Sequence, residues 1–139
     1  MIRLVNEIRS ERGLATVEID NTLMMAARFH AQTCAQLENP NHDIMFHNWG
    51  PYATDPNADH GASFNAATAF GAQLSWTGGN GAAGQTTPEE LVQGWMDSPP
   101  HRAYMLSPEH RYIGAGSHVG GPPYGIYHYM FLSDRPSLR

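Results

Sequence analysis

The chain has 139 residues, of which 41% are hydrophobic and 10% aromatic. A chain of this length fits one domain and can bury a core without disulfide or metal support. It has 13 acidic and 8 basic residues, giving a net charge of −5, with no run of like charges. This balance argues against nucleic acid and anionic membrane surfaces as partners. We therefore predict a single monomeric domain over residues 1–139.

No apolar stretch approaches the roughly 20 residues that a membrane-spanning helix needs, so we expect no membrane span. The first residues have an amphipathic helical pattern rather than the pattern of a signal peptide. If the protein is exported, we expect its export signal to lie outside this sequence. Cys34 is the single cysteine, which excludes an internal disulfide, and its apolar helical surroundings predict that it is buried.

Two helices are predicted in the first part of the chain. Apolar side chains recur at helical spacing over residues 1–12. Asp20 is predicted to cap a second helix that ends near Glu38. His30 lies on the apolar face of that helix, and we expect it to be a hydrogen-bonded core histidine.

The middle of the chain has weaker signals. Residues 39–61 are rich in Pro, Asn, Asp and His without a clear period, which predicts a long loop of the kind that often carries function. Ser63 is predicted to cap a short third helix, and residues 72–76 alternate like a strand. Residues 77–84 are interpreted as a glycine-rich turn.

A further helix has the clearest start in the sequence. Thr87 and Glu90 have the spacing of a capping box, and the helix is predicted to end at residues 98–100, Ser-Pro-Pro. Two strands are predicted over residues 112–118 and 124–132, joined as a hairpin. The predicted fold class is α+β, with helices flanking a small, mostly antiparallel sheet.

Eight histidines in 139 residues are unusual, because imidazole can act as a metal ligand, acid or base. Four lie in polar loop or strand-end contexts and are expected to be solvated: His42, His60, His110 and His118. Three others are the candidates for a functional role: His47, His101 and His128.

No familiar catalytic motif is present. The sequence lacks an H-E-x-x-H helix, a G-x-S-x-G elbow and cysteines with zinc spacing. Residues 78–81, Gly-Gly-Asn-Gly, lack the Lys and Ser/Thr of a nucleotide-binding loop. A turn with positive φ is the preferred interpretation of that segment.

The segment from Gln85 to Arg102 carries a specific pattern, with Thr-Thr-Pro-Glu-Glu followed by Trp-Met-Asp-Ser-Pro-Pro-His-Arg. Leu106 and the run Ile113-Gly114-Ala115-Gly116 follow it at the expected distances. Together with the opening helix and residues 26–31, this pattern resembles the bacterial branch of the CAP superfamily, the SCP-like domains. The resemblance covers nearly the whole chain.

The resemblance implies a three-layer α-β-α sandwich, usually exported. It also implies a cleft with two histidines and two acidic residues that can bind a divalent cation such as zinc. Known members bind sterols, fatty acids or other proteins. His47 matches the first cleft histidine, and Asn80 matches the asparagine of the Gly-Glu-Asn motif. The glutamate of that motif is Gly79 here, so we expect weaker metal binding.

The resemblance leaves other cleft positions open. The second acidic position falls near Ser98, with Asp97 adjacent. The final histidine falls at Tyr127 or His128, and a shift of one residue in a strand changes the face of the sheet. The metal ligands that the resemblance suggests are His47 and His128.

His101 has two interpretations of equal weight. It either takes part in the cleft or bonds to the backbone and fixes the chain after the preceding helix. Pro100 replaces the glycine that is usual in the family before this histidine.

Three functions are compatible with these features. The preferred one is a secreted or surface-associated binding domain, whose ligand is a lipid or sterol-like molecule, a cell-wall component or another protein. Residues 39–61 and four aromatic side chains are expected to contact it: Trp49, Tyr52, Phe64 and Trp76. The alternative is a metal-assisted hydrolase that uses His47 with His101 or His128, ranked lower because Gly79 removes the obvious general base. The third is a structural appendage of a larger envelope protein.

Overall fold

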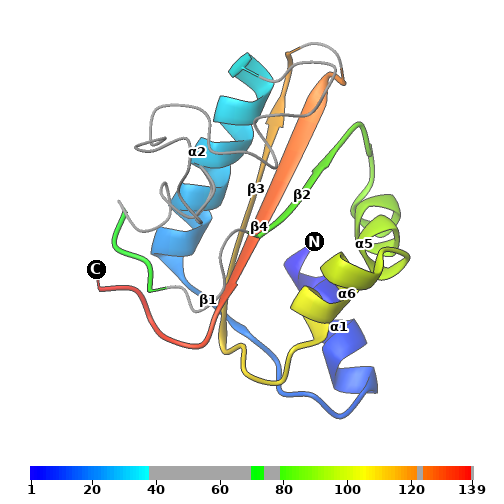
Figure 1. Ribbon diagram of the computed structural model, residues 1–139, viewed down its shortest axis with the longest axis vertical. Helices are drawn as coiled ribbons and strands as arrows, with labels where there is room; N and C mark the ends of the chain where they lie inside the picture. Colours follow the sequence, from blue (N-terminus) through cyan, green and yellow to red (C-terminus); the bar gives the residue numbers. More distant parts are fainter. Residues whose placement is uncertain (38–69, 74–78, 122–123, 139) are drawn as a thin grey trace.

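The computed structural model describes residues 1–37, 70–73, 79–121 and 124–138. These residues form three layers, with a sheet between helices, as predicted (Figure 1). The described helices are α1 (Ile2–Glu11), α2 (Asn21–Leu37), α5 (Pro88–Met96) and α6 (Pro99–Leu106). The described strands are β1 (Glu18–Ile19), β2 (Asn80–Ala83), β3 (Tyr112–Val119) and β4 (Ile126–Ser133). Helix α2 covers one face of the sheet, and α1, α5 and α6 lie on the other (Figure 1).

The sheet has the strand order β1-β3-β4-β2. The β1–β3 pair is parallel, and the β3–β4 and β2–β4 pairs are antiparallel. The predicted hairpin is confirmed, because β3 and β4 pair along their full lengths. Their register places Ser117 opposite His128.

Alternation along β4 divides its side chains between the two helical layers. Three aromatic side chains of β4 pack in the clusters formed with α2: Tyr127, Tyr129 and Phe131. Met130 and Leu132 pack in the other core, with side chains of α1, α5 and α6. Successive side chains of a strand point to opposite faces, so His128 lies on the face of Met130.

Two glycines of β3 allow α2 to lie very close to the sheet. A Cβ at Gly114 would lie 2.1 Å from the backbone of Leu23, and one at Gly116 would lie 2.5 Å from the backbone of Arg28. Any larger residue would force the helix away from the sheet. The Ile-Gly-Ala-Gly motif therefore combines two apolar side chains on one face with close backbone contact on the other.

The first two helices match their predictions. Helix α1 begins and ends within one residue of the predicted bounds, and Asp20 caps α2 by accepting a hydrogen bond from the Leu23 backbone N–H at 3.0 Å. Cys34 is buried, as predicted. His30 is also buried, but its Nε2 has no hydrogen-bond partner among the described residues. The prediction of a hydrogen-bonded core histidine is therefore wrong at that nitrogen.

Helix α5 begins as predicted, with the Thr87 hydroxyl oxygen accepting a hydrogen bond from the Glu90 backbone N–H at 3.1 Å. Helix α5 ends just before the predicted stop at residues 98–100. The same residues begin α6, a helix that was not predicted from the sequence. Pro99 is the first residue of α6, a position where the missing N–H of proline costs no hydrogen bond. The prolines therefore start a helix as well as ending one.

The predicted turn over residues 77–84 is wrong for its second half. Residues Asn80–Ala83 form β2, an edge strand paired with β4. The alternation predicted over residues 72–76 does not give a strand at Ala72 or Gln73, and residues 74–78 lie outside the described part. Residues 80–83 form a strand because they pair with β4, which is distant in the sequence. Local turn signals give no information about such pairing. The helix predicted from Ser63 also lies outside the described residues.

The expectation that His110 is solvated is wrong. Its side chain has no exposed surface and packs edge-to-face on Tyr104, with ring centroids 5.1 Å apart. Arg9, which is also buried, donates hydrogen bonds to the carbonyl oxygens of Met105 at 2.8 Å and Ser107 at 2.9 Å. A third bond reaches the His110 carbonyl at 3.4 Å. The guanidinium therefore ties α1 to the segment after α6.

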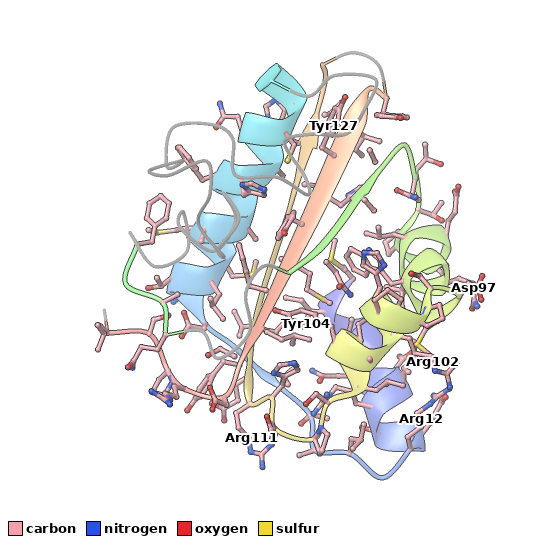
Figure 2. All side chains as sticks on the ribbon, in the orientation of Figure 1. Arg12, Asp97, Arg102, Tyr104, Arg111 and Tyr127 are labelled. Carbon is pink, nitrogen blue, oxygen red and sulfur yellow. The ribbon has the colours of Figure 1, made fainter. Side chains whose placement is uncertain are left out.

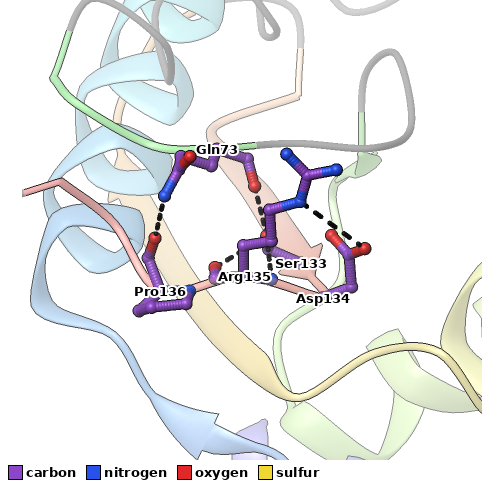
Figure 3. A network of polar contacts seen from close by, with 5 residues as sticks. All are labelled: Gln73, Ser133, Asp134, Arg135 and Pro136. Carbon is purple, nitrogen blue, oxygen red and sulfur yellow. Dashed lines mark hydrogen bonds and ion pairs between the residues drawn. The ribbon is translucent and has the colours of Figure 1, made fainter.

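The segment after β4 folds back along the molecule. The Ser133 hydroxyl bonds to the Gln73 carbonyl, and the Gln73 side chain donates to the Pro136 carbonyl at 2.8 Å (Figure 3). Further on, Asp20 accepts hydrogen bonds from the Ser137 backbone and hydroxyl. The tail thus closes onto the start of α2. Within the described ranges, none of the helices has the length and apolar character needed to cross a bilayer.

Candidate functional site

A pocket of about 230 Å³ lies beside His128, between the start of α5 and the sheet. Its apolar walls come from Met1, Pro88 and Leu91. Its polar lining comes from Thr86, Thr87, Ser117 and His128. The lining of the pocket thus combines apolar side chains with three hydroxyl groups and one imidazole.

The hydrogen bonds of His128 define its tautomer. Its Nε2 lies 2.9 Å from the carbonyl oxygen of Gln85, which can only accept, so Nε2 carries a proton. Its Nδ1 lies 2.7 Å from Oγ of Ser117. In the neutral ring Nδ1 has a lone pair and accepts from the Ser117 hydroxyl. The pair therefore has a defined donor, Ser117, and a defined acceptor, His128.

His128 is held neutral by its surroundings. Only 6% of its surface is exposed, and burial lowers the pKa of the imidazole, partly offset by its bond to the Gln85 carbonyl. Ser117, by contrast, is exposed. A buried neutral base is therefore hydrogen-bonded to the hydroxyl of an exposed serine, and both residues line the pocket.

His128 was a candidate from the sequence, whereas Ser117 and Gln85 were not. Ser117 faces His128 only because of the β3–β4 register. Gln85 lies just after β2, and its carbonyl reaches the imidazole because β2 runs along the other edge of β4. The predicted hairpin was the available signal for Ser117, but loop composition alone does not fix a register.

His101 and Ser98 form a second hydrogen-bonded pair, at the start of α6. Ser98 is the N-cap residue, and its Oγ lies 2.8 Å from Nδ1 of His101. The Asn80 side chain donates to the His101 carbonyl at 3.1 Å, which joins α6 to β2. Burial lowers the pKa of His101. Neither Ser98 nor His101 is among the residues that line the pocket beside His128.

Asp97 lies at the end of α5 with an exposed side chain (Figure 2). Its Oδ1 accepts a hydrogen bond from the Gln93 side chain at 2.9 Å. The carboxylate therefore points along the outer surface of the helix.

Gly79 faces the opposite side of the sheet from His128. A Cβ there would lie 2.4 Å from the Met130 carbonyl oxygen and 2.8 Å from Cε1 of Tyr129. The predicted positive φ is wrong at Gly79, whose φ lies outside that range. Glycine is required at position 79 because its backbone lies close to β4, and not because of its backbone conformation.

The space beside Gly79 belongs to an aromatic cluster against α2. The His30 ring packs edge-to-face on Tyr129, with centroids 4.5 Å apart, and burial lowers the pKa of His30 to about 4. The residues that the resemblance assigns to one cleft are thus divided by the sheet. Asn80, His101 and His128 lie on the face of α5 and α6, whereas Gly79 lies on the face of α2, as does Tyr127, the other position open to the final histidine.

A metal site does not form among the described residues, where no three His, Cys, Asp or Glu side chains are grouped as a cation would need. The lone pair of His128, on Nδ1, already accepts the hydrogen bond from Ser117, and Nε2 carries the proton donated to Gln85, so neither nitrogen is available to a metal in this arrangement. His47 lies outside the described residues, as do the predicted loop 39–61 and four aromatic candidates: Trp49, Tyr52, Phe64 and Trp76.

Solved structures with this fold come from several bacteria. An outer surface protein from Borrelia burgdorferi superposes with a TM-score of 0.69 at 19% identity and covers 96% of this chain and 90% of that one. An extracellular protein containing an SCP domain from Bacillus anthracis str. Ames gives a TM-score of 0.65 at 21% identity. There, 94% of this chain matches 38% of the other.

Sequence comparison identifies a relative as well. The uncharacterized protein YkwD of Bacillus subtilis (strain 168) is 34% identical over 116 residues, which are 84% of this chain and 40% of that protein. The chain thus spans well under half the length of that relative. Residues 2–132 match the CAP family, described as the cysteine-rich secretory protein family. The chain therefore belongs to the CAP family.

Proposed function

We propose that this chain is an extracellular or cell-envelope binding domain that holds a small molecule in the pocket beside His128. The observation that carries the proposal is the composition of that pocket, whose lining combines apolar side chains with hydroxyl and imidazole groups. Such a combination suits a ligand with an apolar body and a polar, uncharged end.

The protonation state of His128 limits which ligand groups the pocket can bind. A neutral imidazole whose proton is already donated to Gln85 offers no positive charge to an anion. The two threonines and Ser117 instead offer hydroxyl groups that both donate and accept hydrogen bonds. The expected ligand group is therefore an alcohol, an ester or an amide.

The size of the pocket limits how much of a ligand it takes. Its volume of about 230 Å³ is below the range of about 300 to 1,000 Å³ that encloses a drug-sized molecule. We infer that one end of a lipid, sterol-like or cell-wall molecule enters the pocket while the rest lies on the surface. The outer-surface and extracellular relatives support a location outside the cytoplasm.

Equilibrium dialysis with three labelled, uncharged probes tests the proposal: cholesterol, palmitamide and tri-N-acetylglucosamine. Thr86 is exposed and lines the pocket, so Thr86→Trp is expected to fill the pocket without disturbing the core. Gln93→Trp, on the exposed face of α5, is the matched control. We expect at least one probe to bind the parent protein. That probe should bind Thr86→Trp at least about 10-fold more weakly than the parent, and Gln93→Trp as tightly as the parent. Equal binding to all three proteins would place the site elsewhere, and no binding of any probe would contradict the proposal.

A further inference from the structure

The pair formed by Ser117 and His128 has the parts of an activated nucleophile. Ser117 is exposed at the pocket, and its hydroxyl donates to Nδ1 of a buried, neutral imidazole at 2.7 Å. A serine hydroxyl is a weak nucleophile unless an adjacent base takes its proton. Here the base is within direct hydrogen-bond reach, and it faces the nucleophile from the neighbouring strand.

A third group fixes the base in the tautomer that this chemistry needs. The Gln85 carbonyl accepts the Nε2 proton at 2.9 Å, which leaves the lone pair on Nδ1 directed at Ser117. A carbonyl oxygen also stabilises the imidazolium that forms when Nδ1 takes a proton, although less than a carboxylate does. The arrangement therefore contains a nucleophile, a base and an orienting group, in that order.

The pocket supplies the remaining requirements of acyl transfer. Pro88 and Leu91 form an apolar wall for a short acyl chain. Thr86 and Thr87 add hydroxyl groups to the lining, and the hydroxyl proton of Thr87 is left to donate because its oxygen accepts the capping bond from the Glu90 backbone N–H. Hydroxyl donors of this kind can stabilise the negative oxygen that develops on an attacked carbonyl.

We propose that Ser117 and His128 hydrolyse small carboxylic esters through an acyl-enzyme intermediate. Oγ of Ser117 bonds to the ester carbonyl carbon as its proton passes to Nδ1, and the bond from that carbon to the alkoxide oxygen then breaks as Nδ1 protonates this oxygen and the alcohol departs. Water next gives a proton to Nδ1 and attacks the acyl carbon, and Oγ leaves and recovers the proton. The products are one acid and one alcohol. The inference rests on the proposed function, since the ester enters the same pocket.

Covalent labelling tests the nucleophile directly. The whole chain is incubated with an alkyl fluorophosphonate, and the modified residue is identified by peptide mass spectrometry, alongside release of p-nitrophenol from p-nitrophenyl butyrate. We expect label on Ser117. We also expect hydrolysis to fall at least about 100-fold in Ser117→Ala, in line with the usual contribution of acid–base and nucleophilic groups.

Matched variants separate this role from a structural one. Ser98→Ala removes a hydroxyl from the other serine–histidine pair, outside the pocket, and is expected to leave labelling and hydrolysis unchanged. His128→Gln should retain Ser117 but label at least about 10-fold more slowly. Because His128 is buried and this variant can fail to fold, Ser117→Ala at its exposed position carries the test independently, with folding checked by circular dichroism.

The outcomes distinguish the two proposals. Probe binding without label on Ser117 would overturn the nucleophile and leave the binding domain standing. Equal hydrolysis by parent and Ser117→Ala would also overturn it. Label on Ser117 that Thr86→Trp does not slow would overturn the assignment of the reaction to this pocket.

Discussion

Replacing Gly79 by alanine tests why this chain lacks the carboxylate of the family's Gly-Glu-Asn motif. The new Cβ would lie 2.4 Å from the Met130 carbonyl oxygen and 2.8 Å from Cε1 of Tyr129. The Met130 backbone is held in the β2–β4 pairing, so it cannot retreat freely. Overpacking of this kind costs about 1 to 3 kcal/mol. We expect Gly79→Ala to lose that much stability in urea denaturation followed by circular dichroism.

Gly94 provides the matched control. It lies in the interior of α5, it is exposed, and apart from its chain neighbours and the backbone of its own helix no described atom lies within 4 Å of an added Cβ. Gly94→Ala is expected to raise the free energy of unfolding by about 0.5 to 1 kcal/mol, because alanine loses less backbone freedom in a helix. The two glycine-to-alanine changes should therefore have opposite signs. A Gly79→Ala variant as stable as the parent would refute the close contact with β4. It would mean that this position can accept a side chain.

Three further changes test the packing of the helical layer. Trp95→Ala should cost about 3 to 5 kcal/mol in urea denaturation, because the side chain is 3% exposed and its Nε1 donates to the Gly81 carbonyl; a loss below about 1 kcal/mol would contradict that burial. Thr87→Ala should cost about 1 kcal/mol in the same assay by removing the cap of α5, and an unchanged midpoint would contradict the cap. Arg9→Met leaves the buried Met105 carbonyl without its donor, at a cost of about 1 to 3 kcal/mol, whereas the His110 carbonyl keeps a hydrogen bond from Arg111 at 2.9 Å, so thermal unfolding should shift down by several degrees; an unchanged melting temperature would show that water replaces the guanidinium.

The elements predicted well are those whose signals are local. The cap at Thr87 and the apolar spacing behind it specify where α5 begins. The glycine- and proline-rich segment between two β-rich runs specifies the hairpin of β3 and β4. Each signal lies within about ten residues of the structure that it predicts, so sequence reasoning can recognise it.

The elements and contacts that were missed depend on distant partners. Strand β2 has the composition of a turn and is a strand because β4 is its neighbour. His110 lies in a polar segment and is buried because Tyr104 and the guanidinium of Arg9 cover it. The pairing of Ser117 with His128 likewise needs the register of the hairpin. Periodicity shows which residues share a face, but not which residue lies opposite.

The carboxylate of Asp20 should give the fold a defined dependence on acid. Burial alone would raise the pKa of Asp20, but hydrogen bonds from the Ser137 and Leu23 backbones and the Ser137 hydroxyl outweigh it and lower that pKa. A carboxyl whose pKa is lower in the folded state stabilises the fold at any pH above its unfolded value of about 3.9. That stabilisation is lost as pH falls through the folded pKa.

The difference in unfolding free energy between the parent and Asp20→Asn isolates this term, because the other carboxylates are common to both proteins. We expect a constant difference above about pH 5 that shrinks below about pH 4, where the parent loses its charge as well. The difference is measured by urea denaturation at each pH. A difference that stays constant down to about pH 2 would mean that the hydrogen bonds, not the charge, account for the contribution of Asp20. The tail at Ser137 would then hold the start of α2 equally well in acid.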